Sequence, residues 1–460
     1  MKALLILTYL ILTSTLLETY QTEPSNTKLL IGYFRHGARR EQKAIKSDNV
    51  AEYPDPNFGI GDLTPTGMRQ EYLLGKALSV QYPQLFGKTA DISTVKVHGS
   101  TFNRTIASAH SLFSGIYDLG SGQDIESDVK RNYLPPIEGF NPEVFEGKSA
   151  LPNSATLFPV IVSSFVNNHL FTPDNDVTCK PLNARRKEIE KQMNLDYTKD
   201  FEPLFAKLNE FGYKPSMFEK DSFDFLSGLE VCDLIVSRAF NDHEFDKFDA
   251  SLMEQCVYLN TFHGFRLNSG DYVKAINQKI NQKVIQILED FLNPKIEKKE
   301  KAVLFSGHDT SLESFWNNFF PDNWKCVLGN YKAKYGRQEE GDLGEGQCVD
   351  LIKFSANMLF EVHEEEGEFL MNLRFNNRLV FMNGGNKKVS VKEVIQLLKD
   401  SANGDWDKIC RPEVTDKKIG AGLMYLFIAT TILVLLTVGY YVSLSRTEKK
   451  STADYEYNAI

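Results

Sequence analysis

The sequence predicts a mixed α/β fold: a sheet flanked by helices, with an inserted helical cap and one C-terminal transmembrane helix. An apolar run typical of a buried strand occurs early, at residues 29–34, a second strand is expected at 95–100, and an apolar run returns late, from residue 302. Between them, residues 129–270 are irregular, charged and largely helical in pattern. Residues 419–444 carry no charge and are longer than the roughly 20 apolar residues that a membrane-spanning helix needs.

These patterns divide the chain into successive parts. We expect a signal peptide (1–20), the first part of an α/β core (21–128), a mostly helical cap (129–270), the second part of the core (271–418), the transmembrane helix (419–444) and a cytoplasmic tail (445–460). A cap inserted into such a core would overhang the strand ends. We therefore expect a ligand between core and cap.

Inside the core, individual elements can be placed. Thr64 and Pro65 suit the N-cap and first turn of a helix, and the chain from Ile106 onward is helical in pattern. Apolar residues at helical spacing between residues 273 and 291 predict a long amphipathic helix that ends at Pro294. Two antiparallel strands, 355–362 and 369–375, are expected to be joined by an acidic turn at 364–367, which is more often a solvated hairpin tip than a metal site.

Both ends of the chain indicate a type I membrane protein. Lys2 and the apolar residues 3–12 resemble a secretory signal, and this run is short for a membrane anchor. Arg446, Lys449 and Lys450 directly follow the expected span, so the positive-inside rule places the tail in the cytoplasm. The body of the protein would then lie in a lumen or outside the cell. The net charge of −9 argues against nucleic-acid binding.

The tail ends in Tyr457-Asn458-Ala459-Ile460, which resembles the tyrosine-based sorting signals that clathrin adaptors bind. A solvated tail without such a role is the alternative. If the tail is a sorting signal, we expect the protein in an endosomal or lysosomal membrane, with the cell surface as a second location.

Six cysteines lie between the two expected membrane-targeting segments: Cys179, Cys232, Cys256, Cys326, Cys348 and Cys410. Their number is even and their expected compartment is oxidising, so disulfides are favoured. They form no CxxC or histidine-paired spacing that would suggest zinc. Six cysteines allow 15 connectivities, among which the spacing does not choose.

Two motifs at strand ends carry the expected chemistry. The first strand leads into Arg35-His36-Gly37-Ala38-Arg39-Arg40, where Gly37 is expected to permit a sharp turn. The carboxyl ends of parallel strands are where open α/β sheets bind ligands, and guanidinium groups match phosphate oxygens in charge and geometry. A histidine held between two arginines could attack phosphorus.

The second motif, Ser306-Gly307-His308-Asp309, follows the late strand. His308 could contact a phosphate oxygen, and Asp309 could protonate a leaving oxygen, which contributes roughly 10²–10⁴-fold to a rate. Arg104, after the second strand, could complete a cationic pocket. Each of these residues alone could have an ordinary structural role. Because cationic or acid–base groups follow three separate strands, the set as a whole favours phosphoryl transfer.

The sequence resembles the histidine acid phosphatases, branch 2 of the histidine phosphatase superfamily. RHGARR is similar to the family's RHG-x-R signature and LFSGHDTSL to its late His-Asp motif. The segment that carries the family's third pocket arginine resembles STFNRTIASA here. The family's LT-x-x-G-x-x-Q helix is similar to LTPTGMRQEYLLGKAL, and a segment of its cap resembles FHGFRLNSG. The resemblance covers most of the region between signal and span. Together with the signal, span and tyrosine tail, it points to the family's membrane-anchored lysosomal members.

The resemblance implies a phosphoglycerate-mutase-like mixed sheet and a role for each motif residue. His36 would be the nucleophile that forms a phosphohistidine, and Asp309 the proton donor. Arg35, Arg39, Arg104 and His308 would bind the phosphoryl oxygens. No metal or other cofactor would be needed, because guanidinium groups take the place of the cation.

Some features depart from the family or follow from it alone. Glu41 stands where the family often has proline, so we expect a changed loop, and Arg40 is assigned only as a loop residue. Asn103-Arg104-Thr105 is a glycosylation sequon, which we expect to be unused because a glycan would crowd Arg104. The resemblance implies the disulfide Cys179–Cys410, and the other four cysteines are assigned as Cys326–Cys348 and Cys232–Cys256. It leaves a homodimer open.

The expected function is therefore hydrolysis of small phosphomonoesters at acidic pH, since an unperturbed aspartate is protonated only near about pH 3.9. Two alternatives remain at this stage. One is a non-catalytic receptor that binds anions on the same fold, and the other is a phosphatase specialised for inositol phosphates or lysophospholipids.

Overall fold

The computed structural model describes residues 26–43, 57–125, 148–162, 169–171, 174–241, 249–336, 351–382, 385, 387–402, 406–410 and 427–444. The chain divides into two compact units, Met1–Trp406 and Asp407–Ile460. The predicted signal peptide, the first residues of the predicted span and the tail with Tyr457 and Ile460 lie outside the described residues.

The first unit is built on one mixed sheet with the strand order β3-β2-β4-β1-β5-β6-β7, and β8 pairs with β6. The strands are β1 (Leu29–Arg35), β2 (Val95–Gly99), β3 (Ile161–Val162), β4 (Ala302–Gly307), β5 (Asn357–Glu365), β6 (Glu368–Phe375), β7 (Arg378–Val380) and β8 (Val389–Ser390). β1, β2, β3 and β4 are parallel, and β5 runs antiparallel to β1. The sheet is thus mixed, as the sequence predicts.

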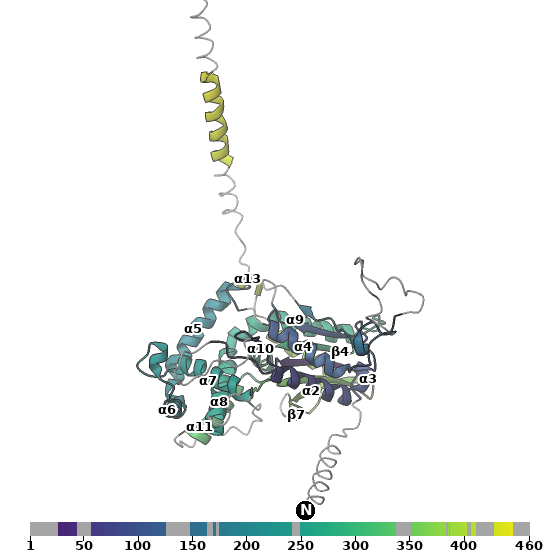
Figure 1. The fold of residues 1–460 in the computed structure, drawn as a ribbon. Coiled ribbons are helices and arrows are strands. Elements are labelled where there is room, and N and C mark those ends of the chain that lie inside the picture. The colour runs from purple at the N-terminus through teal and green to yellow at the C-terminus, as the bar shows by residue number, and fades with distance from the viewer. Residues whose placement is uncertain are drawn as a thin grey trace, which may run out of the picture. The chain divides into compact units, whose positions relative to one another are not determined.

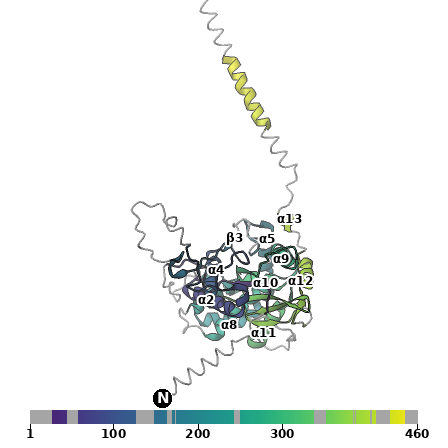
Figure 2. The ribbon, with the colours of Figure 1, turned by 90° about the vertical axis from the view of Figure 1, so that its right-hand side faces the viewer.

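Helices cover both faces of this sheet (Figure 2). They are α2 (Pro65–Gln81), α3 (Pro83–Phe86), α4 (Asn103–Ile116), α9 (Gly270–Leu292), α10 (Asp309–Trp316) and α12 (Val391–Ser401). Side chains of β1 lie on both faces of the sheet. Leu30 and Phe34 pack in the core beneath α2 and α4, whereas Tyr33 on the other face stacks on Phe315 of α10. All seven residues of β1 are buried, which explains its continuous apolar pattern.

The cap consists of helices that gather beside the strand ends (Figure 1). They are α5 (Lys180–Tyr197), α6 (Glu202–Glu210), α7 (Phe225–Phe240), α8 (Ala250–Leu267) and α11 (Asn323–Tyr335). The region 129–270, which the sequence suggested to be helical, also contributes β3 to the core sheet. α11 lies beyond this region in the sequence yet packs on α8 of the cap.

α2 and α4 approach each other unusually closely. A Cβ atom at Gly75 would lie 2.0 Å from the Leu112 carbonyl oxygen, and one at Gly115 would lie 2.0 Å from the Tyr72 carbonyl oxygen. Only glycine fits at these two positions. α2 itself begins as predicted, because the Thr64 side chain accepts a hydrogen bond from the Gly67 N–H and Pro65 stands in the first turn.

The hairpin of β5 and β6 has a tighter turn than the sequence suggested. β5 continues through Glu365, so the connection is Glu366-Gly367 rather than residues 364–367. Both residues have positive φ, 50° and 84°, which is typical of two-residue hairpin turns. The acidic cluster is therefore partly strand and partly turn.

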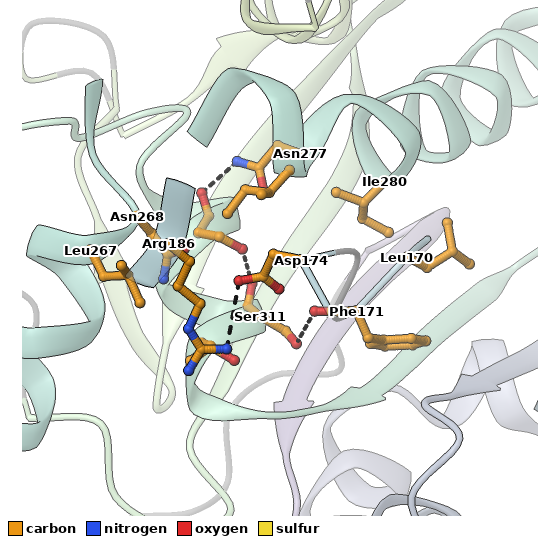
Figure 3. A pocket seen from close by; sticks show the side chains of 12 residues that line it. Leu170, Phe171, Asp174, Arg186, Leu267, Asn268, Asn277, Ile280 and Ser311 are labelled. Carbon is orange, nitrogen blue, oxygen red and sulfur yellow. Dashed lines mark hydrogen bonds and ion pairs between the residues drawn. The ribbon is translucent and has the colours of Figure 1, made fainter. Parts of the chain in front are cut away.

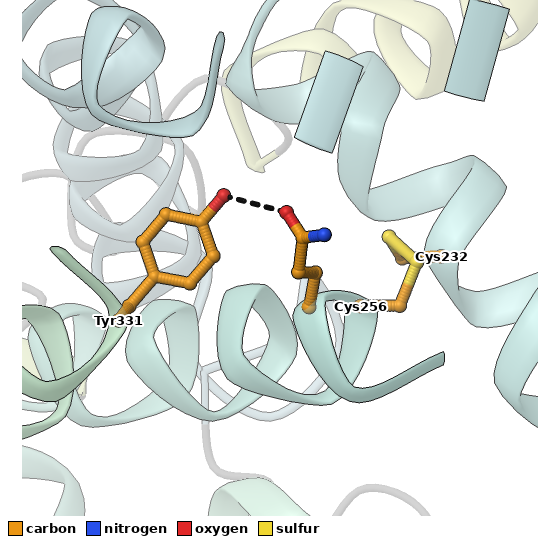
Figure 4. Close-up of a disulfide and its surroundings, with 4 residues drawn as sticks. Cys232, Cys256 and Tyr331 are labelled. Atoms are coloured by element: carbon orange, nitrogen blue, oxygen red, sulfur yellow. Dashed lines mark hydrogen bonds between the residues drawn. A yellow bond between two sulfur atoms is a disulfide. The ribbon is translucent and has the colours of Figure 1, made fainter. Parts of the chain in front are cut away.

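A disulfide joins Cys232 of α7 to Cys256 of α8 (Figure 4). Beside it, the Tyr331 hydroxyl of α11 donates a hydrogen bond to Gln255 Oε1 at 3.2 Å. Cys179, Cys326 and Cys410 are also disulfide-bonded, whereas Cys348 lies outside the described residues. The pairs Cys179–Cys410 and Cys326–Cys348 stay predictions.

The second unit contains one long apolar helix, Phe427–Leu444, with a mean hydropathy of 2.0 over its 18 residues. At a rise of about 1.5 Å per residue it is about 27 Å long, close to the thickness of a bilayer's hydrocarbon core. It lies inside the predicted span 419–444.

Candidate active site

Three adjacent parallel strands bring the predicted site residues to one edge of the sheet. β4 lies between β2 and β1, so the ends of these strands are neighbours. Arg35 ends β1 and His36 follows it, Arg104 lies in the first turn of α4 after β2, and His308 and Asp309 follow β4. His36 and His308 are far apart in the sequence, yet their ring centroids lie only 5.5 Å apart.

Gly37 is needed for close packing against α2, whereas the sequence suggested that it permits a sharp turn. Its backbone does not adopt the positive φ of a glycine-specific turn. Instead, a Cβ atom there would lie 2.3 Å from the carbonyl oxygen of Gly67, and a Cβ at Gly67 would lie 2.1 Å from the carbonyl oxygen of Ala38. The two glycines let the first turn of α2 pack directly on the loop after β1. This contact fixes the path of the loop that carries His36 and Arg39.

His36 is a buried, neutral imidazole with one nitrogen available. Its Nδ1 lies 2.9 Å from the Gly37 carbonyl oxygen, which can only accept, so Nδ1 carries the proton and Nε2 holds the lone pair. Burial and the nearby Arg104 and Arg35 guanidiniums lower the pKa of His36 well below its usual value. The imidazole therefore keeps its lone pair in acidic solution.

Arg35 is fixed by three contacts at the base of the site. Its Nη2 lies 2.7 Å from Asp309 Oδ2, and its Nη1 donates to the Ile352 carbonyl oxygen at 2.9 Å. The guanidinium also lies 4.3 Å above the ring of Phe354. These contacts orient the guanidinium plane before any substrate arrives.

Arg39 is paired with a residue that the sequence analysis did not identify. Asp233 of α7 accepts from Arg39 Nη2 at 2.5 Å and from Nη1 at 3.3 Å, and Ser237 Oγ lies 3.2 Å from Nη1. Because Asp233 belongs to the cap, this ion pair also attaches the cap to the loop after β1. No local motif marks Asp233, so only the tertiary fold reveals it.

His308 and Arg104 form a second histidine–arginine contact. Arg104 Nη2 lies 3.4 Å from His308 Nδ1, and Ser100 Oγ lies 2.9 Å from His308 Nε2. Arg104 can only donate, so Nδ1 accepts and Nε2 carries the proton. Burial and Arg104 lower the pKa of His308. Phe102 packs against both residues, with the Arg104 guanidinium 4.5 Å from its ring.

Asp309 is ionised in the free site. Burial alone would raise its pKa, but the guanidinium groups of Arg35 and Arg39 hold the pKa below its usual value. About a third of the Asp309 side chain is exposed to the cavity. It can therefore meet a leaving group, although it needs a proton before it can act as an acid.

These side chains line a cavity of about 510 Å³ between core and cap. Arg186 and Glu190 of α5, Asp233 of α7 and His263 of α8 form its cap wall. The cavity lies between core and cap, where the sequence predicts that a ligand binds. Among the described residues, no group of three or more histidine, cysteine and acidic side chains could hold a metal ion.

A second cavity of about 40 Å³ lies behind this wall (Figure 3). Asp174 stands at its centre, accepting from the Tyr272 hydroxyl at 2.7 Å and lying 3.7 Å from Arg186 Nη1. The volume is that of a water-sized space rather than a substrate pocket. Its polar groups hold Arg186 in place on the wall of the larger cavity.

The remaining predicted residues lie outside the cavity. Arg40 donates to the Phe58 carbonyl oxygen at 2.5 Å and contacts the buried Glu41, so both are loop residues of the β1–α2 connection. Asn103 is exposed, whereas the Thr105 hydroxyl of the same sequon is buried and donates to the Ser100 carbonyl oxygen.

The chain belongs to the histidine phosphatase superfamily (branch 2), whose family model matches residues 21–376. Lysosomal acid phosphatase of Bos taurus is 32% identical over 126 residues, which cover 27% of this chain and 30% of that protein. The enzyme of the same name from Homo sapiens is 29% identical over 102 residues, or 22% and 24% of the two chains. The matched segments thus span about a quarter to a third of these relatives' length.

Solved structures show the same fold. A Hafnia alvei phytase in complex with myo-inositol hexakis sulphate has a TM-score of 0.55 at 12% identity, over 82% of this chain and 97% of that chain. A Citrobacter braakii phytase has a TM-score of 0.54 at 12% identity, over 82% and 98%. At this identity both likenesses concern the fold alone.

Proposed function

We propose that the protein is a membrane-anchored acid phosphatase that hydrolyses phosphate monoesters through a phosphohistidine. The observation that carries this proposal is that His36 Nε2, which has no hydrogen-bond partner among the described residues, lines one cavity together with three guanidinium groups. Histidine phosphatase family membership supports the same chemistry.

In this proposal the phosphoryl group occupies the space between Arg35, Arg39 and Arg104, which stabilise the charge on its oxygens. His36 Nε2 attacks phosphorus, the bond to the leaving oxygen breaks, and Asp309 gives that oxygen a proton. Water then attacks the phosphohistidine, returns a proton to Asp309 and releases inorganic phosphate. Splitting one displacement into two steps means that water attacks the phosphohistidine and not the phosphate ester itself.

An acidic optimum follows from the signs of the pKa shifts. Asp309 must be protonated, and a bound phosphate dianion, by taking over Arg35 and Arg39, raises its pKa from the depressed value of the free site. Lower pH increases the protonated fraction further. His36 does not compete for that proton, because burial and the arginines lower its pKa. Activity should therefore fall as the pH rises to neutrality.

The charge pattern of the cavity supports substrates with one phosphate group. Outside the three arginines, the described cationic side chains of the wall are paired: Lys43 with Glu230, and Arg186 Nε with Glu190 at 3.1 Å. A second phosphate would meet these carboxylates. We therefore expect p-nitrophenyl phosphate and glycerol 2-phosphate to be hydrolysed with a higher kcat/KM than inositol hexakisphosphate.

Replacing the nucleophile tests the proposal. His36→Ala should lower kcat/KM for p-nitrophenyl phosphate by at least about 10³-fold, because no phosphohistidine can form. His110→Ala, which removes an exposed histidine of α4, is the matched control and should keep the full activity. Absence of turnover by the unmodified protein would instead favour an anion-binding receptor on the same fold.

The apolar helix and the lysosomal relatives support a location in the endosomal or lysosomal membrane, with the active site in the lumen. The tyrosine tail would serve adaptor binding. Fluorescence of the tagged protein, with and without the Tyr457→Ala substitution, tests both statements.

A further inference from the structure

A second buried carboxyl group lies in the active-site cavity. Glu313 is on α10, one helical turn after Asp309, and lines the same cavity although only 2% of the residue is exposed. The mechanism proposed above does not use it. Within the described part of the chain, no hydrogen bond or ion pair engages its carboxyl group, although a buried carboxyl normally has one.

The cap leaves space for this carboxyl at one glycine. A Cβ atom at Gly264 of α8 would lie 1.6 Å from Glu313 Oε2, so any other residue there would displace the carboxyl. The charged groups around Glu313 are Asp309 on its own helix and Arg35 at the end of β1, while α8 presents the Gly264 backbone beside His263. Burial and the charge of Asp309 raise the pKa of Glu313 well above its usual value, against the opposing effect of Arg35.

The two neighbouring carboxyls thus differ in protonation. Asp309 pairs with Arg35 at 2.7 Å, which favours its ionised form, whereas burial and the charge of Asp309 raise the pKa of Glu313 and favour its protonated form. In active sites that transfer protons, the surroundings often shift the pKa values of two neighbouring titratable groups in opposite directions.

We propose that Glu313 is a positioning residue for proton donation, which holds a proton and passes it to Asp309 as the leaving group departs. This inference rests on the proposed function. As the His36–phosphorus bond forms and the phosphorus–oxygen bond breaks, Glu313 gives its proton through a water molecule in the cavity to Asp309, which passes it to the leaving oxygen, so both carboxyls end this step ionised. When water attacks the phosphohistidine, its released proton returns through Asp309 to Glu313, so the cycle balances.

The leaving group provides the test. p-Nitrophenolate departs without a proton, whereas the alkoxide of glycerol 2-phosphate needs one. Glu313→Gln should therefore shift the ratio of the two kcat/KM values by about 10-fold or more against glycerol 2-phosphate. Gly264→Ala, which displaces the carboxyl without removing it, should shift the ratio in the same direction.

Glu71→Gln is the matched control, because Glu71 is also a fully buried carboxyl with a raised pKa but lies on α2, outside the lining of the cavity. It should leave the ratio unchanged. An unchanged ratio in Glu313→Gln, even with both activities reduced, would show a structural role and overturn the inference. Failure of the unmodified protein to hydrolyse either ester would instead overturn the proposed function.

Discussion

Both cavity-lining arginines of the RHGARR segment bind a carboxylate in the free protein, Arg35 that of Asp309 and Arg39 that of Asp233. A phosphate group must displace these partners or share the guanidiniums with them. The ion pairs keep the buried cations from being left unpaired, which would be costly. Because phosphate must compete with these carboxylates, the two ion pairs weaken phosphate binding. Weaker binding favours release of the product.

His308 offers a direct test of this electrostatic arrangement. In the free protein burial and Arg104 lower its pKa, so the ring is neutral near pH 5. A phosphate dianion between the arginines reverses the sign of the local field and should raise the pKa, giving an imidazolium that donates to phosphate. Nitrogen chemical shifts of labelled histidine, with and without inorganic phosphate, should show this protonation.

Comparison with the His308→Gln variant assigns the signal. At pH values where free phosphate is already a dianion, binding takes up one proton, so phosphate affinity should rise as the pH falls, by up to about tenfold per pH unit. Shifts that do not respond to saturating phosphate would contradict the expected pKa change.

At this scale the sequence could predict residues that belong to strand-end motifs but not their partners. His36, Arg35 and Asp309 each follow an apolar strand with a glycine nearby, which is a local signal. Asp233 and Glu313 stand in helical segments without such a signal. Asp233 reaches Arg39 across 194 residues of sequence, so its role depends on how the cap folds back.

At the scale of elements, the contact between α2 and α4 depends on two glycines. Gly75→Ala or Gly115→Ala would place a methyl group 2.0 Å from a carbonyl oxygen of the other helix, and neither backbone can yield without separating the helices. Each substitution should lower the free energy of unfolding by at least about 2 kcal/mol. The midpoint of urea unfolding measures this loss.

Gly329→Ala is the control for helix propensity. Gly329 lies within α11, and a Cβ atom there meets nothing within 4 Å. Alanine should stabilise this helix by roughly 0.5–1 kcal/mol. If the α2 and α4 variants behaved like this control, the close contact would be refuted.

The longer elements were predictable because their patterns are periodic. The amphipathic pattern between residues 273 and 291 is confirmed as α9, and the buried runs as β1, β2 and β4. β3, with two residues, and β8, also with two, are too short to show alternation. The start of α4 at Asn103, before the predicted Ile106, reflects a first turn formed from polar residues.

At the scale of the whole molecule, the boundary between the two compact units lies after Trp406. A chain that ends at residue 418 retains Cys410 and lacks the apolar helix. We expect this shortened protein to enter the aqueous phase in detergent partitioning, while the full chain enters the detergent phase. Its kcat/KM should stay within about twofold of the full chain, since every described cavity residue precedes residue 407. Membrane retention of the shortened protein would contradict the assigned anchor.

The position of β4 between β1 and β2 has a consequence for biosynthesis. During translation β1 emerges about 270 residues, and β2 about 200 residues, before β4, the strand that pairs with both of them. At about 5–20 residues per second, the edges that later pair with β4 stay unpaired for roughly 10–40 s in β2 and roughly 13–53 s in β1, a period in which exposed strand edges favour aggregation. His308 and Asp309 arrive with β4 itself, so the nascent chain gains the last of the predicted site residues only when β4 joins β1 and β2.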